Sequence, residues 1–446
     1  MTTLPLDQRF ADAMGQLLGP HFPSDIGLAV SGGGDSMAML YLAHNWTRQF
    51  GVRLWVVTVD HGLRSESAAE ALLVAEECAA LGWPHTILRW HWDGQGNVQD
   101  AARQARLNLI DRWRGDVSHV LFAHTQDDQA ETVLMRLARG SGVDGLAGMA
   151  PRREVALHPL GIAAIPEESV DGAMPLQRAR TPTFEVLRPC LDMSREDLRH
   201  YARVLQGRWV EDPSNQDRRY DRVRVRDLLK LLHQEGITAP DLAKTAARMA
   251  RAQSGLNARL VDALDQCCRD APIGQVLIGR DAFATFDEET QLRLLTSSLC
   301  YVASAEYRPR AASSDALLER VLSGSGGTLH GAEVIVEKAK IRVMRELAAV
   351  QDEVSCVGEL WDGQWCFAAV DATEFQVKAL GQEGWEQISS KVLPDVTYKS
   401  ALPLPALWSH HDVISTPAAD GMLSTNATRY VLGRIDTGFR AFCLSH

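Results

Sequence analysis

The sequence predicts an α/β protein in which a doubly wound parallel sheet is followed by a mainly helical region and a small C-terminal domain of uncertain class. Over the first 150 residues, short apolar runs alternate with helical patterns, as in parallel strands joined by crossover helices. The chain has 446 residues, 46% of them hydrophobic and 23% charged. It is therefore long enough for roughly two to four globular domains.

The elements of the sheet region can be placed in order along the chain. Strands are expected at 26–30, 54–60, 85–90 and 119–124, and helices at 36–46, 67–81, 98–113 and 127–139. The second helix is alanine-rich and ends at Gly82, and Gly140-Ser141-Gly142 ends the fourth. This alternation indicates a doubly wound domain.

The remaining chain is less regular. Residues 151–186 are expected to form an irregular or hairpin-containing insertion, because prolines and glycines interrupt any period. Helical patterns resume at Ser194, an expected N-cap, with Asp197 at the third helical position. A loop is expected at 212–220 and a strand-rich stretch at 328–346. The predicted domains are 1–186, 187–346 and a divergent 351–446.

Composition excludes several classes of protein. No apolar run of about 18 residues occurs, and the N-terminus lacks a basic stretch followed by an apolar one, so we expect a cytoplasmic protein with no membrane association. The eight cysteines include no C-x-x-C pair, so reduced core thiols are expected rather than a zinc or iron-sulfur site.

Local charge differs from the net charge of −11. Residues 188–260 carry 15 Lys+Arg against 10 Asp+Glu, whereas residues 351–446 carry 6 against 12. The helical middle is therefore the candidate nucleic-acid face. The alternative is that its arginines solvate helix surfaces and pair with nearby acids.

The most specific local feature is Ser31-Gly32-Gly33-Gly34-Asp35-Ser36, between an apolar strand and an apolar helix. Glycines let backbone N–H groups approach an anion, and a helix N-terminus adds partial positive charge. The loop is neither a Walker A nor a G-x-G-x-x-G sequence. Asp35 would repel phosphate unless a divalent cation lay between them, so the loop predicts a magnesium-nucleotide site. The alternative is a plain glycine-rich turn with Asp35 stabilised by the helix dipole.

A second polar segment, His124 to Thr132, follows the fourth strand, where open α/β sheets bind ligands. If the helix includes His124, its spacing puts His124, Asp127, Asp128 and Glu131 on one side. A cation or a positively charged substrate would relieve the repulsion among the carboxylates. The alternative is a solvated acidic first turn.

Two further positions extend this set of residues. Asp60 ends the second strand, and Arg103 and Arg106 lie on the third helix. Arginine offers a fork of donors that suits a triphosphate. Spacing does not separate Arg103 from Arg106, and either could be a surface salt-bridge partner.

The loop resembles the PP-loop, or N-type, ATP pyrophosphatases, whose S-G-G-x-D-S signature it matches at all five fixed positions. Members of that superfamily cleave ATP between the α and β phosphates and adenylate an acceptor. Within it, the chain is similar to the tRNA(Ile)-lysidine synthetase family over roughly residues 25 to 346. The similar segments are 59–64, 104–106, 124–132, 139–149, 187–189, 209–215 with Arg222, 328–329 and 345–346.

The resemblance implies ATP-dependent ligation of L-lysine to C2 of the wobble cytidine of a tRNA(Ile) with a CAU anticodon. The cytidine oxygen first attacks the α-phosphate of ATP and pyrophosphate leaves. The lysine ε-amine then attacks C2 and AMP leaves, which gives lysidine. The expected cofactors are ATP and Mg²⁺, and the expected partners are lysine and the tRNA.

Expected residue roles follow from the motifs and the resemblance. ATP is held by Ser31, Gly32, Gly33, Gly34, Asp35, Ser36 and Asp60, and the metal by Asp35 and Asp127. The catalytic residues are Asp35, Arg106, His124, Asp127 and Asp128. Asp128 and Glu131 attract lysine, and His124 or a carboxylate accepts the proton of the ε-amine. Arg139, Arg188, Arg222 and Arg224 contact tRNA phosphates.

Other functions on the same fold stay open at this point. A tRNA thiolase would need catalytic cysteines, usually paired, and a small-molecule amide synthetase would leave the basic middle unexplained. A nucleotide-binding regulatory module would not need so many acidic and basic residues in the site. Family members often carry a basic C-terminal domain, whereas residues 351–446 are acidic here. A homodimer is compatible with the sequence but is not indicated by it.

Overall fold

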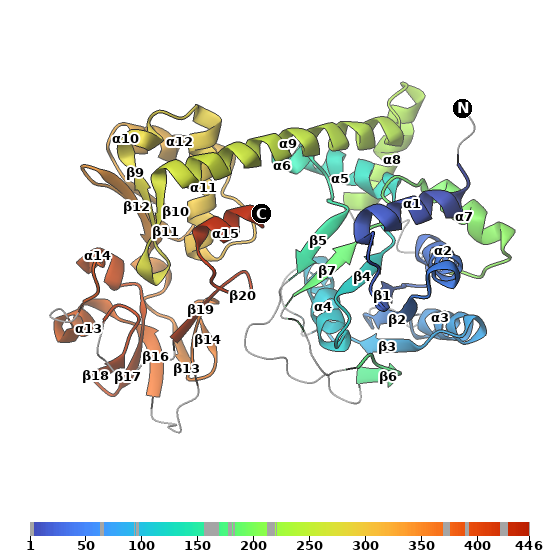
Figure 1. Ribbon diagram of the computed structural model, residues 1–446, viewed down its shortest axis with the longest axis horizontal. Helices are drawn as coiled ribbons and strands as arrows, with labels where there is room; N and C mark the ends of the chain where they lie inside the picture. Colours follow the sequence, from blue (N-terminus) through green and yellow to red (C-terminus); the bar gives the residue numbers. More distant parts are fainter. Residues whose placement is uncertain are drawn as a thin grey trace. The chain divides into compact units, whose positions relative to one another are not determined.

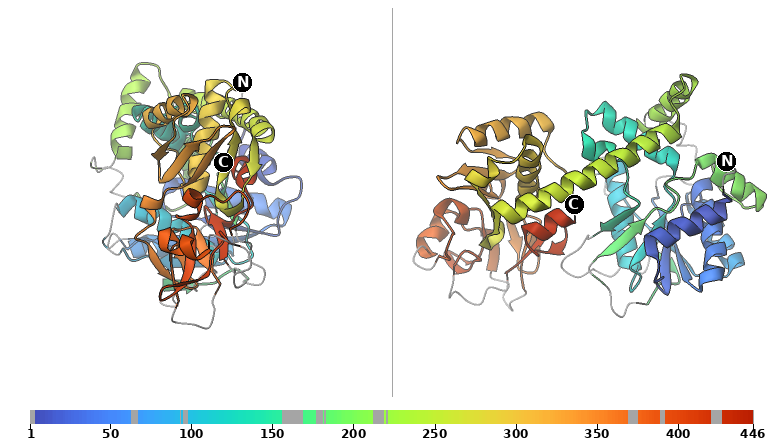
Figure 2. Two further views of the ribbon diagram at one scale, coloured as in Figure 1. Left: turned by 90° about the vertical axis from the view of Figure 1, so that its left-hand side faces the viewer. Right: turned by 45° about the horizontal axis from the view of Figure 1, so that its top comes forward.

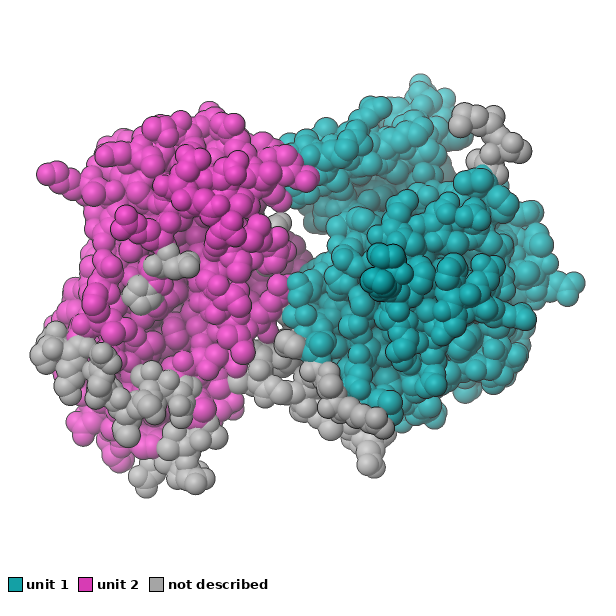
Figure 3. All heavy atoms as spheres, viewed as in Figure 1, with its two compact units in different colours: residues 1–157, 162–253 teal, residues 158–161, 254–446 magenta. Residues whose placement is uncertain are grey.

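The computed structural model describes residues 4–62, 67–92, 94, 98–155, 169–176, 181, 183–211, 219, 221–368, 375–388, 392–419 and 427–445. The chain forms two compact units, residues 1–157 with 162–253 and residues 158–161 with 254–446 (Figure 3). The first unit extends past the predicted domain end at residue 186. The predicted division between 346 and 351 lies inside the second unit.

The described part of the first unit contains a seven-stranded sheet in the order β5-β7-β4-β1-β2-β3-β6. The strands are β1 (Asp25–Ala29), β2 (Arg53–Asp60), β3 (His85–Arg89), β4 (His119–Phe122), β5 (Arg152–Val155), β6 (Val170–Gly172) and β7 (Phe184–Leu187). The five central strands pair in parallel, and the two edge strands, β5 and β6, pair antiparallel. The interior of β1 is buried throughout, as its apolar sequence requires in a sheet covered on both faces.

Helices cover both faces of this sheet (Figure 1). They are α1 (Leu6–Leu18), α2 (Gly34–Phe50), α3 (Ser67–Leu81), α4 (Val98–Trp113), α5 (Gln126–Ala138) and the short α6 (Val143–Leu146). One core joins α1, α2 and α3 to strands β1 and β2, and another joins α4 to strands β3, β4, β5 and β7. This is the doubly wound architecture that the sequence predicts.

The predicted strands and helices of the sheet region are confirmed within a few residues, and α3 and α4 have the predicted bounds. Helix α1 and the parallel strand β7 were not predicted from the sequence. The helix was also considered to include His124, which is wrong, because α5 begins at Gln126 and His124 lies outside it. Thr125 is the N-cap, and its side chain forms a capping box with Asp128, which ends the helix before His124.

The predicted insertion at 151–186 is described only in part. Its described residues contribute the two edge strands and most of β7, so this stretch completes the sheet. Residues 156–168, 177–180 and 182 lie outside the described residues. Most of the predicted loop at 212–220 also lies outside them.

Three further helices follow: α7 (Arg195–Val204), α8 (Asp221–Gln234) and α9 (Ala239–Cys267). Ser194 caps α7 by accepting a hydrogen bond from the Asp197 amide at 3.0 Å, as predicted. Helix α7 packs against α2, and α8 packs against α5, so both belong to the first unit. The right-hand view in Figure 2 shows α9 as one continuous helix, and the boundary between the units falls within it.

The second unit has its own cores. A five-stranded sheet, in the order β10-β11-β12-β9-β8, packs with α9 to α12. The elements are β8 (Cys268–Asp270), β9 (Val276–Gly279), α10 (Arg280–Phe283), α11 (Glu288–Ala303), α12 (Ala311–Leu322), β10 (Gly327–Leu329), β11 (Ala332–Val336) and β12 (Lys340–Arg345), with 3-10 turns at Pro272–Gly274 and Leu347–Ala349. The strands β10 to β12 confirm the predicted strand-rich stretch.

The last part of the chain forms two four-stranded sheets, β13-β16-β17-β18 and β14-β15-β19-β20. Its elements are β13 (Val354–Cys356), β14 (Leu360–Trp361), β15 (Trp365–Phe367), β16 (Phe375–Ala379), α13 (Gly381–Ile388), α14 (Tyr398–Ala401), β17 (Pro405–Ser409), β18 (Asp412–Ser415), β19 (Ala427–Val431), β20 (Arg434–Ile435) and α15 (Phe439–Leu444). Phe439, Phe442 and Cys443 of α15 enter the core of the five-stranded sheet. The C-terminal residues therefore share a core with residues 260–343.

The structure also bears on the predictions about cysteines and membrane-spanning helices. All eight cysteines are free, and six of them are buried. Among the described residues, no helix is long and apolar enough to cross a bilayer.

Candidate active site

A cavity of about 700 Å³ lies at the carboxyl ends of β1, β2 and β4. Each of these strands ends in one of the predicted segments, because parallel strands present their carboxyl ends at the same edge. The lining includes Ser31, Gly33, Gly34, Asp35, Ser36, Asp60, His61, Arg106, His124, Asp128, Arg195, Arg199, Arg222 and Arg226. The cavity therefore brings together most of the residues that the sequence analysis singled out.

The glycine loop turns tightly between β1 and α2. Gly32 has a φ of +84°, a conformation that glycine adopts without strain. The Ser36 hydroxyl holds the bend, because it accepts a hydrogen bond from the Ser31 amide at 3.1 Å and donates one to the Gly33 carbonyl at 2.9 Å. The first turn of α2 therefore presents its free amides at the cavity.

Gly33 offers a direct test of phosphate binding in this loop. A Cβ built at Gly33 meets only the Ser31 Oγ, at 3.7 Å, so Gly33→Ala should fold normally but narrow the space for an anion. We expect unfolding at an unchanged temperature and a loss of ATP affinity of roughly tenfold or more, because the methyl group would keep phosphate oxygens from approaching the backbone closely. Calorimetry with ATP measures the affinity. Gly15→Ala, whose Cβ has open space in α1, is the control, and equal affinities would contradict phosphate binding here.

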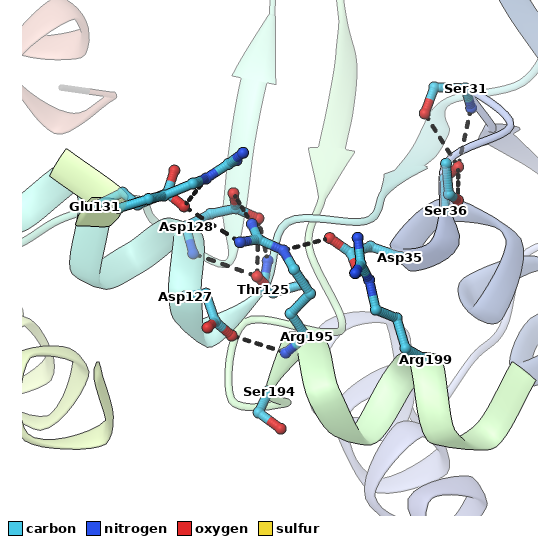
Figure 4. Close-up of polar contacts among 12 residues, drawn as sticks. Ser31, Asp35, Ser36, Thr125, Asp127, Asp128, Glu131, Ser194, Arg195 and Arg199 are labelled. Atoms are coloured by element: carbon cyan, nitrogen blue, oxygen red, sulfur yellow. Dashed lines mark hydrogen bonds and ion pairs between the residues drawn. The ribbon is translucent and has the colours of Figure 1, made fainter. Parts of the chain in front are cut away.

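Three carboxylates, one from α2 and two from α5, converge on Arg195, the first residue of α7 (Figure 4). Arg195 Nε lies 3.0 Å from Asp35 Oδ2, Nη2 lies 3.0 Å from Asp128 Oδ1, and Nη1 lies 3.4 Å from Glu131 Oε1. Glu131 is 1% exposed and also pairs with Arg226 at 2.6 Å. The positive charge that the sequence analysis expected between the carboxylates is thus supplied in part by the chain itself.

The pKa values of Asp35 and Asp128 are shifted in opposite directions. Burial raises the pKa of Asp35, and Arg195 opposes that shift only in part. Burial also acts to raise the pKa of Asp128, but Arg195 and the Thr125 amide together hold it below its usual value. One oxygen of Asp35 and one of Glu131 are buried and accept no hydrogen bond from any described residue. Asp35 lines the cavity, so its free oxygen is an acceptor for a ligand there, whereas Glu131 is among the residues that line a second cavity.

Asp127 does not join this group. Its Oδ2 accepts a hydrogen bond of 2.7 Å from the Arg195 backbone amide, so it fixes the start of α7. It lines a second cavity, of about 600 Å³, that Glu131, Arg195 and residues of α8 also line. The expectation that Asp127 shares a metal with Asp35 does not fit this placement.

Arg106, and not Arg103, lines the cavity. Arg103 is exposed, whereas Arg106 Nη2 lies 3.4 Å from His61 Nε2. Burial and the neighbouring Arg222 lower the pKa of Arg106, and burial next to Arg106 lowers the pKa of His61 to about 4. Asp60, at the end of β2, accepts a hydrogen bond from the Gly62 amide at 2.9 Å. This wall of the cavity is suited to an anionic ligand.

The four arginines predicted to contact tRNA lie in different environments. Arg222 is exposed, lines the cavity and forms no ion pair within the described part of the chain. Arg139 and Arg224 are exposed and both pair with Asp221. Arg188 is only 8% exposed and donates hydrogen bonds to His124 and to the Ala150 carbonyl. A contact between Arg188 and an RNA backbone does not fit this burial.

Sequence reasoning missed Arg195, Arg199 and the contact of residues 209–211 with the loop. Val210 donates a hydrogen bond to the Gly32 carbonyl at 2.9 Å, and a Cβ at Gly34 would meet Arg199 and Trp209 at 3.3 and 3.4 Å. The resemblance had drawn attention to Trp209-Val210-Glu211, but no local pattern places this segment on the glycine loop. Only the packing of α7 against α2 brings it there.

The carboxylates of the site fit Mg²⁺ in one particular mode of binding. No group of three or more His, Cys, Asp or Glu side chains able to hold a metal occurs within the described part of the chain. Mg²⁺ often needs only one or two protein carboxylates, with nucleotide phosphates and water as its other ligands. The free buried oxygen of Asp35, beside the glycine loop, fits that mode of binding.

A parallel sheet with a glycine loop and a cavity at its carboxyl edge defines the class as an enzyme domain of the PP-loop type. The family model described as a PP-loop domain matches residues 6–232. Among curated proteins, the tRNA(Ile)-lysidine synthase of Ruegeria pomeroyi is 38% identical over 428 residues, which cover 95% of each chain. That of Wolbachia pipientis wMel is 34% identical over 74% of this chain and 73% of its own.

The chain belongs to the tRNA(Ile)-lysidine synthase family. Among solved structures, the U34-tRNA thiolase NcsA from Methanococcus maripaludis matches 55% of this chain and 78% of its own, at 15% identity and a TM-score of 0.41.

Proposed function

We propose that this chain ligates L-lysine to C2 of the wobble cytidine of a tRNA(Ile) with a CAU anticodon, at the expense of ATP. Its membership of the tRNA(Ile)-lysidine synthase family supports the reaction. The observation that carries the proposal is the cavity, in which a glycine loop, basic side chains and a cluster of carboxylates meet. The polyphosphate would bind the glycine loop, the tRNA base would enter beside the basic side chains, and the cationic amino acid would bind the carboxylates.

The first step requires binding of the triphosphate. The amides of the loop, with Ser31 and Ser36, are placed to hold phosphate oxygens, and Asp35 would hold Mg²⁺ through its free oxygen. Bound there, Mg²⁺ would offset the negative charge that grows on the transferred phosphoryl group. Arg106 lies across the cavity and offers donors to the same anion.

The second step requires a lysine with a neutral ε-amine. The free oxygen of Glu131 and the carboxylate of Asp128 are acceptors for an ammonium group. The amine must lose a proton before it attacks C2. The cavity offers the carboxylates of Asp35 and Asp128 as acceptors for that proton.

Among the described residues that line the cavity, none is a cysteine. A thiolase on this fold would attack with cysteine sulfur, so the lining favours ligation over sulfur transfer.

Incubation of the purified protein with ATP, labelled lysine and total tRNA tests the proposal. Label should enter RNA only when ATP is present, and nuclease digestion should release it as a modified cytidine. Control reactions without tRNA distinguish ligation to tRNA from synthesis of a small molecule. Label that enters a small molecule instead, or no RNA label while ATP is consumed, would refute ligation to tRNA.

Arg222 provides a prediction on tRNA binding. Because it is exposed at the cavity and unpaired among the described residues, Arg222→Ala should weaken tRNA binding and make the salt slope shallower by about 1. Filter binding at several salt concentrations measures both quantities. Arg53→Ala is the control, since Arg53 is exposed at the start of β2, at the opposite edge of the sheet. Unchanged affinity and slope would remove Arg222 from the tRNA-binding surface.

A further inference from the structure

The fold places Arg188 beside His124. Strands β4 and β7 pair in parallel, with Leu121 opposite Leu187, so the residues that follow the two strands leave the sheet side by side. The Arg188 backbone amide is held at 2.8 Å by the Pro151 carbonyl. Its side chain donates from Nη1 to the Ala150 carbonyl at 2.6 Å and from Nε to His124 Nδ1 at 3.3 Å. Arg188 is therefore anchored at both ends.

The contact between Arg188 and His124 determines which ring nitrogen of His124 carries the proton. A guanidinium carries only donors, so the ring nitrogen that faces Arg188 must carry a lone pair. The tautomer of a histidine is set by the hydrogen bond of its other nitrogen. With Nδ1 occupied as an acceptor, the single proton of a neutral ring lies on Nε2. Within the described part of the chain, Nε2 has no hydrogen-bond partner, and the ring lines the cavity.

The surroundings also keep the ring neutral and in place. Its plane is nearly parallel to that of Phe122, with an angle of 5° and a centroid distance of 6.0 Å. Burial and the charges of Arg188, Arg222 and Arg106 outweigh Asp128 and lower the pKa of His124 to about 3. The charged groups that face the ring are thus three arginines and one carboxylate.

We propose that Arg188 is a positioning residue that locks His124 in its Nε2–H tautomer, so that His124 donates a hydrogen bond to a substrate oxygen and does not accept the proton of the lysine amine. The proposal rests on the proposed function only for the identity of the substrate oxygen. The tautomer itself is a property of the free protein. If His124 is a donor, the proton of the amine passes to a carboxylate or to solvent.

Nitrogen NMR of the full chain, with ¹⁵N-labelled histidine, tests the tautomer without any substrate. His124 is assigned by comparison with His124→Gln. Between about pH 6 and 8, we expect a lone-pair signal from Nδ1 and an N–H signal from Nε2. An Nδ1–H tautomer, or a doubly protonated ring in that range, would overturn the proposal even if lysine ligation were established. The expected tautomer would stand even if ligation failed.

Two substitutions of His124 distinguish a role as a hydrogen-bond donor from a role as a general base. The amide nitrogen of Gln can take the place of Nε2 as a donor, but an amide is not a base at neutral pH. We expect His124→Gln to keep measurable pyrophosphate release and His124→Ala to lose about 10²- to 10³-fold, the cost of one donor to a developing charge. Equal, complete loss in both variants would contradict the donor role.

Arg188→Met tests the positioning role. We expect its kcat to fall by about tenfold or more, with His124 losing its single tautomer and gaining an acid limb in the pH profile, because a positive neighbour is gone. Arg152→Met is the matched control: Arg152 lies on the adjacent β5, pairs with Glu185 and contacts the Leu17 carbonyl, but does not line the cavity. Added guanidinium should rescue Arg188→Met in part. Loss of activity with an unchanged His124 spectrum and pH profile would overturn the proposal, since Arg188 would then be merely structural.

Discussion

Replacing Asp35 with asparagine is expected to lower tRNA-dependent pyrophosphate release by about 10²- to 10³-fold while leaving the fold intact. Asparagine keeps the shape of the side chain but cannot offset a cation at the triphosphate. Asp35 lines the cavity beside the glycine loop and has a buried oxygen without a partner among the described residues. A coupled pyrophosphate assay measures the effect, and near-normal release would exclude Asp35 from the reaction.

The thermal stability of Asp35→Asn, unlike its activity, should not fall. Burial raises the pKa of Asp35 above its usual value, so its ionised form costs stability in the folded state. A raised pKa means that this group favours folding at low pH, and the contribution is lost as pH rises through the folded pKa. Asp35→Asn should therefore unfold at an equal or higher temperature at pH 7. Asp12→Asn, an exposed change on α1, is the control for both measurements.

Arg195→Met should be among the most destabilising single changes in the first unit. It leaves Asp35, Asp128 and Glu131 close together without the cation that they share. Loss of one partner of a buried ion pair costs about 3–5 kcal/mol. We expect the lower end, because Asp35 is about a fifth exposed and Glu131 keeps Arg226. For a unit of this size, about 3 kcal/mol corresponds to a fall in Tm of roughly 6–12 °C.

The loss should depend on pH. Arg195 lowers the pKa values of Asp35 and Asp128, so both values should rise without it. The variant should therefore be least stable at high pH and recover as these two carboxylates become protonated. In the parent protein, Asp128 has a lowered pKa, and its contribution persists until pH falls through that lowered value. The difference in Tm should therefore narrow from about pH 7 toward pH 5. Thermal unfolding across this range measures it.

Arg208→Met is the matched control for Arg195→Met. Arg208 also bridges two carboxylates, Glu76 and Glu77, at 2.9 Å each, but its side chain is 52% exposed. Exposed ion pairs contribute little to stability, so Tm should change little at any pH. Equal falls in Tm in the two variants would show that the burial of the Arg195 ion pairs does not increase their contribution to stability.

The glycine loop and the start of α5 were predictable because their signals are local. Six consecutive residues, 31–36, determine the bend after β1, and the parallel strands bring residues 60 and 124 to the same edge. From the sequence, Asp127 was predicted to hold a metal with Asp35, and Asp128 to attract lysine. The capping box with Thr125 turns Asp128 toward the cavity, and Asp127 bonds to the start of α7 instead.

Arg195 and Arg188 could not be assigned correctly from local patterns. Arg195 lies 160 residues from Asp35 in sequence and meets it only because α7 packs against α2. At the sequence level it is simply the first residue after a serine cap. Arg188 was predicted to contact RNA because it is basic, but the pairing of β7 with β4 places it beside His124, where it is buried. Charge can be read from sequence, whereas burial cannot.

The sequence by itself determined the alternation of strands and helices, the glycine loop and the membership of a ligase family, since each depends on residues that are near neighbours or occur in a fixed order. Tertiary structure alone decided which cation neutralises the carboxylates, which aspartate bonds to the start of α7 and which nitrogen of His124 carries the proton. These depend on contacts between segments more than 60 residues apart. Such contacts arise from the packing of whole helices and strands, which no short pattern encodes.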